Sequence, residues 1–353
     1  MPCSTREGAP AVDRHNPVPA LFLVLSGIAL YFSELSPSFV AGEVITRFIR
    51  DGVMVLALVI PVTAGMGLNF AVTVGALAAQ VGLIVAVDHG LTGGVGLLAI
   101  TGIGLGLSLL LGYLIGVMLN RVKGKEMIAT IIIGFLATGI YQLVFMVGYG
   151  TLIQPTNQEI MLSRGIGIRN MVDLEPFRNM IDAVWLIEAG SIEIPLFMIL
   201  VVLCFAGLIA YIMHTRLGQQ FRAVGEGIEK ARMLGIDAEA VRIKAMMLST
   251  VLACLGHIIF IQNIGMLNVY TAHMNTDIFA CAALLAGGAS ILRAHVGHAL
   301  LGVLLFHSLF IVSPQAGQNI FANAALGEYF RTFVAYGTIA FALVMSTRKG
   351  VGS

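Results

Sequence analysis

The residues that could catalyse a reaction or hold a metal ion are scattered along this chain. Its four cysteines form no C-x-x-C pair, so neither a zinc site nor a disulfide framework is predicted. The motifs H-E-x-x-H and G-x-S-x-G do not occur, and no carboxylates are paired within the apolar segments. The phosphate-binding motif G-x-x-x-x-G-K-[ST] is also missing, so any ATP hydrolysis must come from another chain. We therefore expect no catalytic residue, no metal site and no cofactor bound by this chain itself.

Uncharged polar side chains inside apolar segments are the residues best suited to binding a solute. Polar residues in a membrane usually face the interior of the helix bundle, and hydroxylated or heteroaromatic solutes need uncharged donors and acceptors. Asn69 follows a break at Gly65 and Gly67, where the backbone must line a cavity or be buried in protein. The alternative for each candidate is a hydrogen bond between helices. The candidates for the solute path are Asn69, Gln80, Gln142, His257, Gln262 and Asn263.

The composition predicts the elements that must position these side chains. Of the 353 residues, 58% are hydrophobic and 11% are charged, whereas a soluble domain carries about 25% charge. The balance of 20 basic and 19 acidic residues excludes nucleic-acid binding as a main role. Because a membrane helix needs about 20 apolar residues, the long uncharged stretches predict an all-α integral membrane protein. We expect one domain over residues 1–353, a polytopic bundle of about ten transmembrane helices, with Gly52–Val87 divided into two short helices.

Basic residues in the loops predict the orientation of this bundle, because cytoplasmic loops are enriched in lysine and arginine. With ten helices and both termini in the cytoplasm, the inner segments hold 14 of the 20 basic residues and only 7 of the 19 acidic residues. An odd number of helices would place the termini on opposite sides. The charge asymmetry therefore favours an even number.

Two loops are long enough to suggest a function. The outer loop, residues 148–193, contains Trp185, the single tryptophan, and is either a lid or docking surface or a solvated connection. The inner loop, residues 214–244, is central in the chain. Its Glu226 and Lys230 have the i,i+4 spacing of a helical ion pair, which predicts one short helix around them.

The end of this short helix is also marked in the sequence. Gly235 has the residue type of a helix stop, and Asp237 that of the N-cap of the next helix. A short amphipathic helix between two membrane helices can present a knob to a cytoplasmic partner. We therefore expect the inner loop to be a docking element.

The residues of the inner loop resemble a known family. The pattern is Thr215-x-Leu217-Gly218, then Arg222-Ala223-x-Gly225-Glu226, then Ala231-Arg232-x-x-Gly235-Ile236. It resembles the coupling loop of the ABC importer permeases for ribose, other simple sugars, nucleosides and branched-chain amino acids. A later segment, Leu285-Ala-Gly-Gly-Ala-Ser290, resembles the Gly-Gly-x-Ser turn of the same permeases. Departures occur at Gly227, where asparagine is common, and at Lys230-Ala231, where an Ala-Ala pair is common.

The resemblance implies a set of roles and partners. Two cytoplasmic ATPase subunits would use ATP and bind the inner loop, a second permease of the same or a paralogous kind would complete the path, and an external solute-binding protein would deliver solute. It also implies a bacterial plasma (inner) membrane, which makes residues 148–193 a periplasmic loop. The coupling residues would be Arg222, Ala223, Gly225, Glu226, Ala231 and Gly235.

An ion-coupled secondary transporter is the main alternative. That class usually needs ionisable residues in the membrane interior, and the stretches Gly52–Val87, Met127–Gln158 and Ala245–Thr276 contain no Asp, Glu, Lys or Arg. Sodium coordinated by the backbone stays open. For the importer, the uncharged candidates favour a simple sugar or nucleoside over an amino acid, whereas the exact solute and the choice of homodimer or heterodimer stay open.

Overall fold

The structure is a computed structural model that describes residues 17–163, 165–178, 180–181, 184–189 and 192–350. The 1–16 part of the predicted cytoplasmic N-terminus and several positions of the 148–193 loop lie outside these residues. Five described helices are long and apolar enough to cross a membrane, namely α5 (Gly93–Arg121), α6 (Glu126–Leu143, continued by a π-turn over Val144–Gly148), α7 (Leu196–His214), α10 (Ala238–Gln262) and α12 (Val296–Phe321).

Shorter helices complete the bundle. Three of them are apolar, α1 (Val18–Ser33), α4 (Val72–Asp88) and α11 (Thr276–Ala286). The others are α2 (Pro37–Leu56), α3 (Val59–Thr63), α8 (Arg216–Glu226), α9 (Ile228–Met233) and α13 (Ala324–Gly350). The chain is thus an all-α, multi-pass membrane protein, as predicted, because a helix satisfies every backbone polar group of a segment that has no water around it. The count of about ten crossings stays a prediction.

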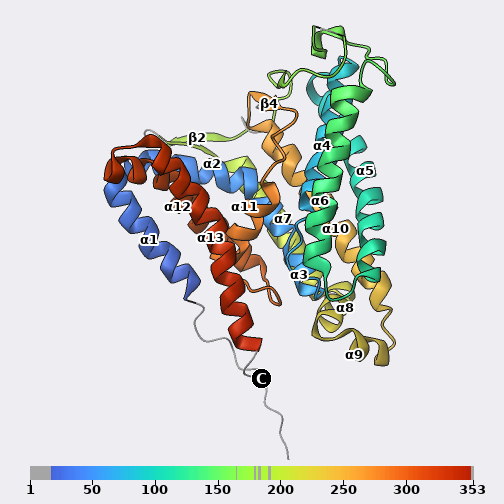
Figure 1. Ribbon diagram of the computed structural model, residues 1–353, viewed down its shortest axis with the longest axis vertical. Coiled ribbons are helices and arrows are strands. Elements are labelled where there is room, and N and C mark those ends of the chain that lie inside the picture. Colours follow the sequence, from blue (N-terminus) through green and yellow to red (C-terminus); the bar gives the residue numbers. More distant parts are fainter. Residues whose placement is uncertain (1–16, 164, 179, 182–183, 190–191, 351–353) are drawn as a thin grey trace, which may run out of the picture.

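The burial of the helices separates a centre from a lipid-facing surface. In the most apolar stretches of α5, α6 and α7, at most 28% of the residues are buried, against 72% in α10. Most of α4 is buried as well. Because the exposed faces of α5 to α7 are apolar, they fit contact with lipid. Figure 1 shows α4, α5, α6 and α10 on one side of the molecule, α1, α12 and α13 on the other, and α2, α3 and α11 between them.

The stretch Gly52–Val87 differs from its prediction. Two short helices were expected, but Gly52 lies within α2, which begins at Pro37, includes charged residues and ends at Leu56. The predicted break is confirmed: the five-residue α3 ends at Thr63, and α4 begins at Val72. Gly65 and Gly67 have left-handed backbone angles, with φ of +74° and +70°, which glycine adopts without steric cost. The helix therefore unwinds between two buried elements.

Two glycines allow α11 to cross α12 at close range. A Cβ atom built on Gly287 would lie 1.9 Å from the backbone oxygen of His298, and one on Gly302 would lie 1.9 Å from that of Ala283. Small residues let membrane helices approach this closely. The Gly-Gly turn noted in the sequence thus serves helix packing.

We expect Gly302→Ala to destabilise the protein, because the added methyl group must push α11 away from α12. Overpacking of this kind costs about 1–3 kcal/mol. Thermal unfolding in detergent measures the loss. The matched control is Gly297→Ala on the same helix, where a Cβ atom meets nothing within 4 Å. Equal unfolding temperatures for the two variants would show that the crossing tolerates a side chain.

Small strands lie at the end of the bundle opposite α8 and α9 (Figure 1). There β2 (Leu186–Ala189) pairs antiparallel with β3 (Ile192–Pro195). In the same region β1 (Met171–Asp173) pairs with β4 (Met266–Asn268), and a single 3₁₀ turn covers Gln158–Ile160. The 148–193 loop is therefore tied to the segment after α10, and Asp88 at the end of α4 accepts hydrogen bonds from the backbone N–H groups of Thr156 and Asn157 at 2.9 and 3.0 Å.

Candidate functional site

Two short helices, rather than one, fill the inner loop between α7 and α10. Gly227, with φ +158°, stands between α8 and α9. The predicted single helix around Glu226 and Lys230 is therefore wrong, because Glu226 ends α8 and Lys230 lies in α9. The departure noted at Gly227 is the residue that separates the two helices.

The end of α9 agrees with its prediction. Gly235 has a left-handed φ of +75° directly after this helix. Asp237 is the N-cap of α10, and its carboxylate accepts hydrogen bonds from the backbone N–H groups of Glu239 and Ala240, both at 3.1 Å. The structure thus places all six predicted coupling residues in α8, α9 and the turn that follows: Arg222, Ala223, Gly225, Glu226, Ala231 and Gly235.

Helix α8 is held against the bundle by buried side chains and by a direct backbone contact. Phe221 and Val224 are buried on one face of α8. A Cβ atom on Gly225 would lie 2.2 Å from the backbone oxygen of Thr63, and one on Gly65 would lie 2.8 Å from the Cα atom of Gly225. The end of α8 therefore rests on the turn where α3 unwinds, with no side chain between the two backbones.

The unwound segment leads from this turn to Asn69. The side-chain nitrogen of Asn69 donates to the hydroxyl oxygen of Ser249 on α10 at 3.1 Å, and that hydroxyl donates to the backbone oxygen of Ala57 at 2.8 Å. Asn69 also accepts a hydrogen bond from the backbone N–H of Ala71 at 3.0 Å. These bonds join the unwound segment, α10 and the end of α2 in the bundle interior.

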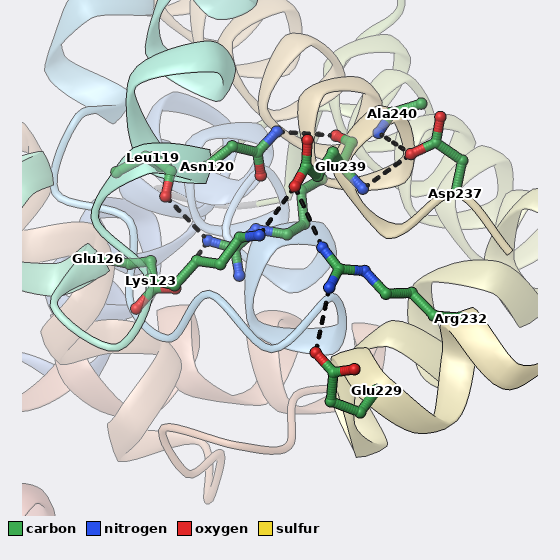
Figure 2. Close-up of polar contacts among 10 residues, drawn as sticks. Leu119, Asn120, Lys123, Glu126, Glu229, Arg232, Asp237, Glu239 and Ala240 are labelled. Atoms are coloured by element: carbon green, nitrogen blue, oxygen red, sulfur yellow. Dashed lines mark hydrogen bonds and ion pairs between the residues drawn. The ribbon is translucent and has the colours of Figure 1, made fainter.

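A network of charged side chains links α9 to the start of α10 and to the turn between α5 and α6, as Figure 2 shows. The carboxylate of Glu239 lies 2.9 Å from Lys123 and 3.2 Å from Arg232, which lies 3.1 Å from Glu229. The backbone oxygen of Glu239 also accepts from Asn120 at 3.0 Å. Each pair is exposed, and such pairs contribute little individually. Of these contacts, Arg232–Glu239 is the one that joins α9 to α10, and Lys123–Glu239 joins α10 to the turn after α5.

A buried ion pair lies beneath this network. A guanidinium nitrogen of Arg242 is 2.7 Å from the carboxylate of Glu126 and donates to the backbone oxygen of Leu119 at 3.2 Å. The Arg242 side chain is 2% exposed and that of Glu126 is 11% exposed. From the sequence, both residues are expected only as charges of inner loops. Glu126 directly precedes one uncharged stretch and Arg242 lies shortly before another, which is the one signal in the sequence that could have paired them.

Gln80 and His257, two predicted path residues, meet in the interior of the bundle. The amide nitrogen of Gln80 lies 3.1 Å from the Nε2 atom of His257, and its amide oxygen lies 3.1 Å from the Nδ1 atom of His273. All three side chains are buried. His273, which precedes α11, was not among the candidates, although it lies within the uncharged stretch Ala245–Thr276 as His257 does.

The other three candidates lie apart from this chain of contacts. Gln142 donates to the backbone oxygen of Tyr270 at 3.3 Å. The side chain of Asn263 accepts a hydrogen bond from the guanidinium of Arg50 on α2. Gln262 is fully buried, and neither of its amide atoms has a hydrogen-bond partner in the described part of the chain. Four of the six candidates, Asn69, Gln80, His257 and Asn263, therefore make contacts that join two helices. For each of them, solute binding stays a prediction beside this structural role.

Helix α2 contains charged residues, although charges are rare in the apolar helices of this chain. Asp51 contacts the Nε2 atom of His307 on α12 at 3.0 Å. The guanidinium carbons of Arg47 and of Arg331 on α13 lie 5.5 and 5.0 Å from the centre of the Phe310 ring. Considered alone, these charges indicate the end of a membrane helix, but α2 includes them because they have partners on α12 and at Asn263, directly after α10.

Comparison with known proteins decides the family. The family described as "Branched-chain amino acid transport system / permease component" matches residues 40–345. The chain belongs to this family. The resemblance stated for the inner loop and the Gly-Gly turn is thereby confirmed.

Curated relatives match a shorter part of this permease-family chain. The "Autoinducer 2 import system permease protein LsrC" of Escherichia coli (strain K12 / DH10B) is 35% identical over 91 residues, which is 26% of each chain. The protein of the same name from Yersinia pseudotuberculosis serotype O:3 (strain YPIII) is 34% identical over 79 residues, or 22% of each chain. The matched region thus spans about a quarter of the length of these relatives.

Proposed function

We propose that this chain is the transmembrane permease subunit of an ATP-binding cassette importer, whose helices form the translocation path for a small polar solute. The family match over residues 40–345 supports this proposal, as does the likeness to import-system permeases. The observation that carries it is the contact of Gly225 on α8 with the turn at Thr63, where the membrane helix unwinds. A displacement of α8 by a partner would therefore be transmitted through this backbone contact to the unwound segment in the bundle interior.

The mechanism is alternating access driven by ATPase subunits. This chain has no nucleotide motif, so ATP must act through a partner that contacts α8 and α9 in different ways in two states. At the end of α9, Met233 and Leu234 are 81% and 75% exposed. Exposed apolar residues flanked by charged ones suit the surface of a protein partner. ATP binding would move α8, and α8 would move the Thr63–Gly65 turn and the unwound segment after it.

The expected partners are two ATPase subunits, a second permease of the same or a paralogous kind, and an extracytoplasmic solute-binding protein. We place the α8–α9 end in the cytoplasm of a bacterium and the 148–193 loop in the periplasm. Support comes from the basic residues gathered at that end: Arg121, Lys123, Lys125, Arg216, Arg222, Lys230, Arg232, Arg242, Lys244 and Arg293. The membrane is then the inner membrane.

The proposed solute is a simple sugar or nucleoside, recognised by uncharged polar groups such as Asn69. This residue is 2% exposed, so solute would reach it only after the unwound segment moves. We expect Asn69→Leu to lower uptake at least about tenfold, a loss of about 1.4 kcal/mol. The matched control is Ser249→Ala, which removes the same hydrogen bond and leaves Asn69 in place. Uptake of labelled sugars and nucleosides into proteoliposomes with the whole importer measures both. Equal losses would assign Asn69 to packing alone.

A pull-down from the native membrane in mild detergent, followed by mass spectrometry, tests the proposed function. We expect an ATPase subunit in stoichiometric amount, accompanied by a permease or a solute-binding protein. If the chain is recovered without an ATPase, also after crosslinking through α8 and α9, the importer assignment fails.

A further inference from the structure

A cavity of about 830 Å³ opens at the α8–α9 end of the bundle, beside the surface through which the proposed partner acts. Its walls come from α3, the end of α7, the α8–α9 pair and the turn that precedes α12. These elements are far apart in the sequence. The cavity therefore exists only in the folded bundle, which makes it a candidate binding site.

The charge on its walls is predominantly positive. Arg222, Lys230 and Arg293 line the cavity, and Glu226 is the acidic residue among its lining side chains. No ion pair of these three basic residues occurs within the described part of the chain. Three cations against one carboxylate leave an excess positive charge that an anionic group would neutralise.

The backbone of α12 adds to this preference for an anion. Arg293, His295, Val296 and Gly297 line the cavity at the start of this 26-residue helix, and no side chain caps its N-terminus. The first N–H groups of a helix have no partner within the helix and favour negative charge. The basic side chains and the helix start thus act on the same cavity.

Apolar residues form the remaining wall. Ala210 and Met213 belong to α7, and Leu292, which is 74% exposed, lies in the turn before α12. Other side chains of α7 expose apolar surface where lipid is expected. A soluble anion needs no such wall, whereas a phospholipid brings acyl chains next to its phosphate group.

We propose that this cavity binds the phosphate headgroup of an anionic phospholipid. Basic pockets between membrane helices at the cytoplasmic surface are suited to such headgroups. A bound headgroup would neutralise Arg222, Lys230 and Arg293 and connect the α8–α9 pair to the start of α12. The inference concerns lipid binding by this chain alone, so it does not depend on the proposed transport activity.

Native mass spectrometry of the full chain, with defined lipids added in detergent, tests the proposal. The variant carries Lys230→Gln and Arg293→Gln, which remove two charges and keep polar side chains at exposed positions. The matched control is Arg121→Gln, an exposed arginine at the same end of the bundle but outside the cavity. The three ligands are phosphatidylglycerol, zwitterionic phosphatidylcholine and inorganic phosphate.

We expect the unsubstituted chain and the Arg121→Gln variant to retain phosphatidylglycerol in preference to phosphatidylcholine. The double variant should bind phosphatidylglycerol about 25-fold more weakly, from about fivefold for each basic residue. Equal retention of the two lipids, or equal affinity of the double variant, would overturn the site. Displacement of phosphatidylglycerol by millimolar inorganic phosphate would overturn the lipid as its ligand. A thermal-unfolding measurement shows that the variants are folded.

Discussion

Replacing Gly225 with alanine is expected to weaken the coupling of ATP hydrolysis to transport while leaving the protein in the membrane. The added methyl group would lie 2.2 Å from the backbone oxygen of Thr63, so α8 must move away from the turn. Such overpacking costs about 1–3 kcal/mol. Between two states of the bundle, that free energy corresponds to about a 5- to 150-fold shift.

Uptake and ATP hydrolysis by the whole importer in proteoliposomes measure this effect. Gly139→Ala on α6 is the control, because a Cβ atom there meets nothing within 4 Å and both substitutions are otherwise alike. The control should retain the uptake of the unsubstituted protein. If Gly225→Ala also transports normally at normal expression, the contact between α8 and the Thr63 turn has no role in coupling.

Arg242→Met is expected to lower the free energy of unfolding by about 3–5 kcal/mol, the cost of leaving a buried charge without its partner. Glu126 would then remain buried without the guanidinium that is its ion-pair partner within the described part of the chain. Thermal unfolding of the purified protein in detergent measures the loss. The double variant Arg242→Met with Glu126→Met should recover most of it, because no buried charge then remains.

An exposed ion pair of the same network provides the comparison. Lys123→Met removes the 2.9 Å contact with Glu239, and the side chains of these residues are 34% and 52% exposed. A surface pair of this kind contributes about 1 kcal/mol at most. If Lys123→Met and Arg242→Met lower the free energy of unfolding equally, burial does not explain how much the Arg242–Glu126 pair contributes to stability.

The sequence predicts those parts of the fold that depend on composition and local residue type. Long uncharged stretches identify membrane helices because burying a charge in lipid is costly. Gly65 and Gly67 locate the break before α4, and Gly235 and Asp237 locate the end of α9 and the start of α10. Each of these features depends on residues that are close together in the sequence, so it can be predicted from a single sequence.

Pairings between distant segments were beyond such reasoning. Charges on α2 predict a loop when the helix is considered alone, but Asp51 has His307 as its partner on α12. Likewise, nothing near Gly225 indicates that it rests on Thr63, because the contact joins two backbones about 160 positions apart. The position of the inner loop between two membrane helices could be predicted, whereas its contact with the Thr63 turn required the structure.

In the proposed importer, an ATPase subunit contacts the surface of α9. A photoreactive amino acid in place of Met233, activated in native membranes, tests this most directly. The same probe in place of Trp185, which is 65% exposed at the opposite end of the bundle, is the control. We expect an adduct at position 233 with a protein that carries the nucleotide motif G-x-x-x-x-G-K-[ST], which this chain lacks, and no such adduct at position 185. An equal adduct at both positions, or none at 233 in an inserted protein, would contradict it.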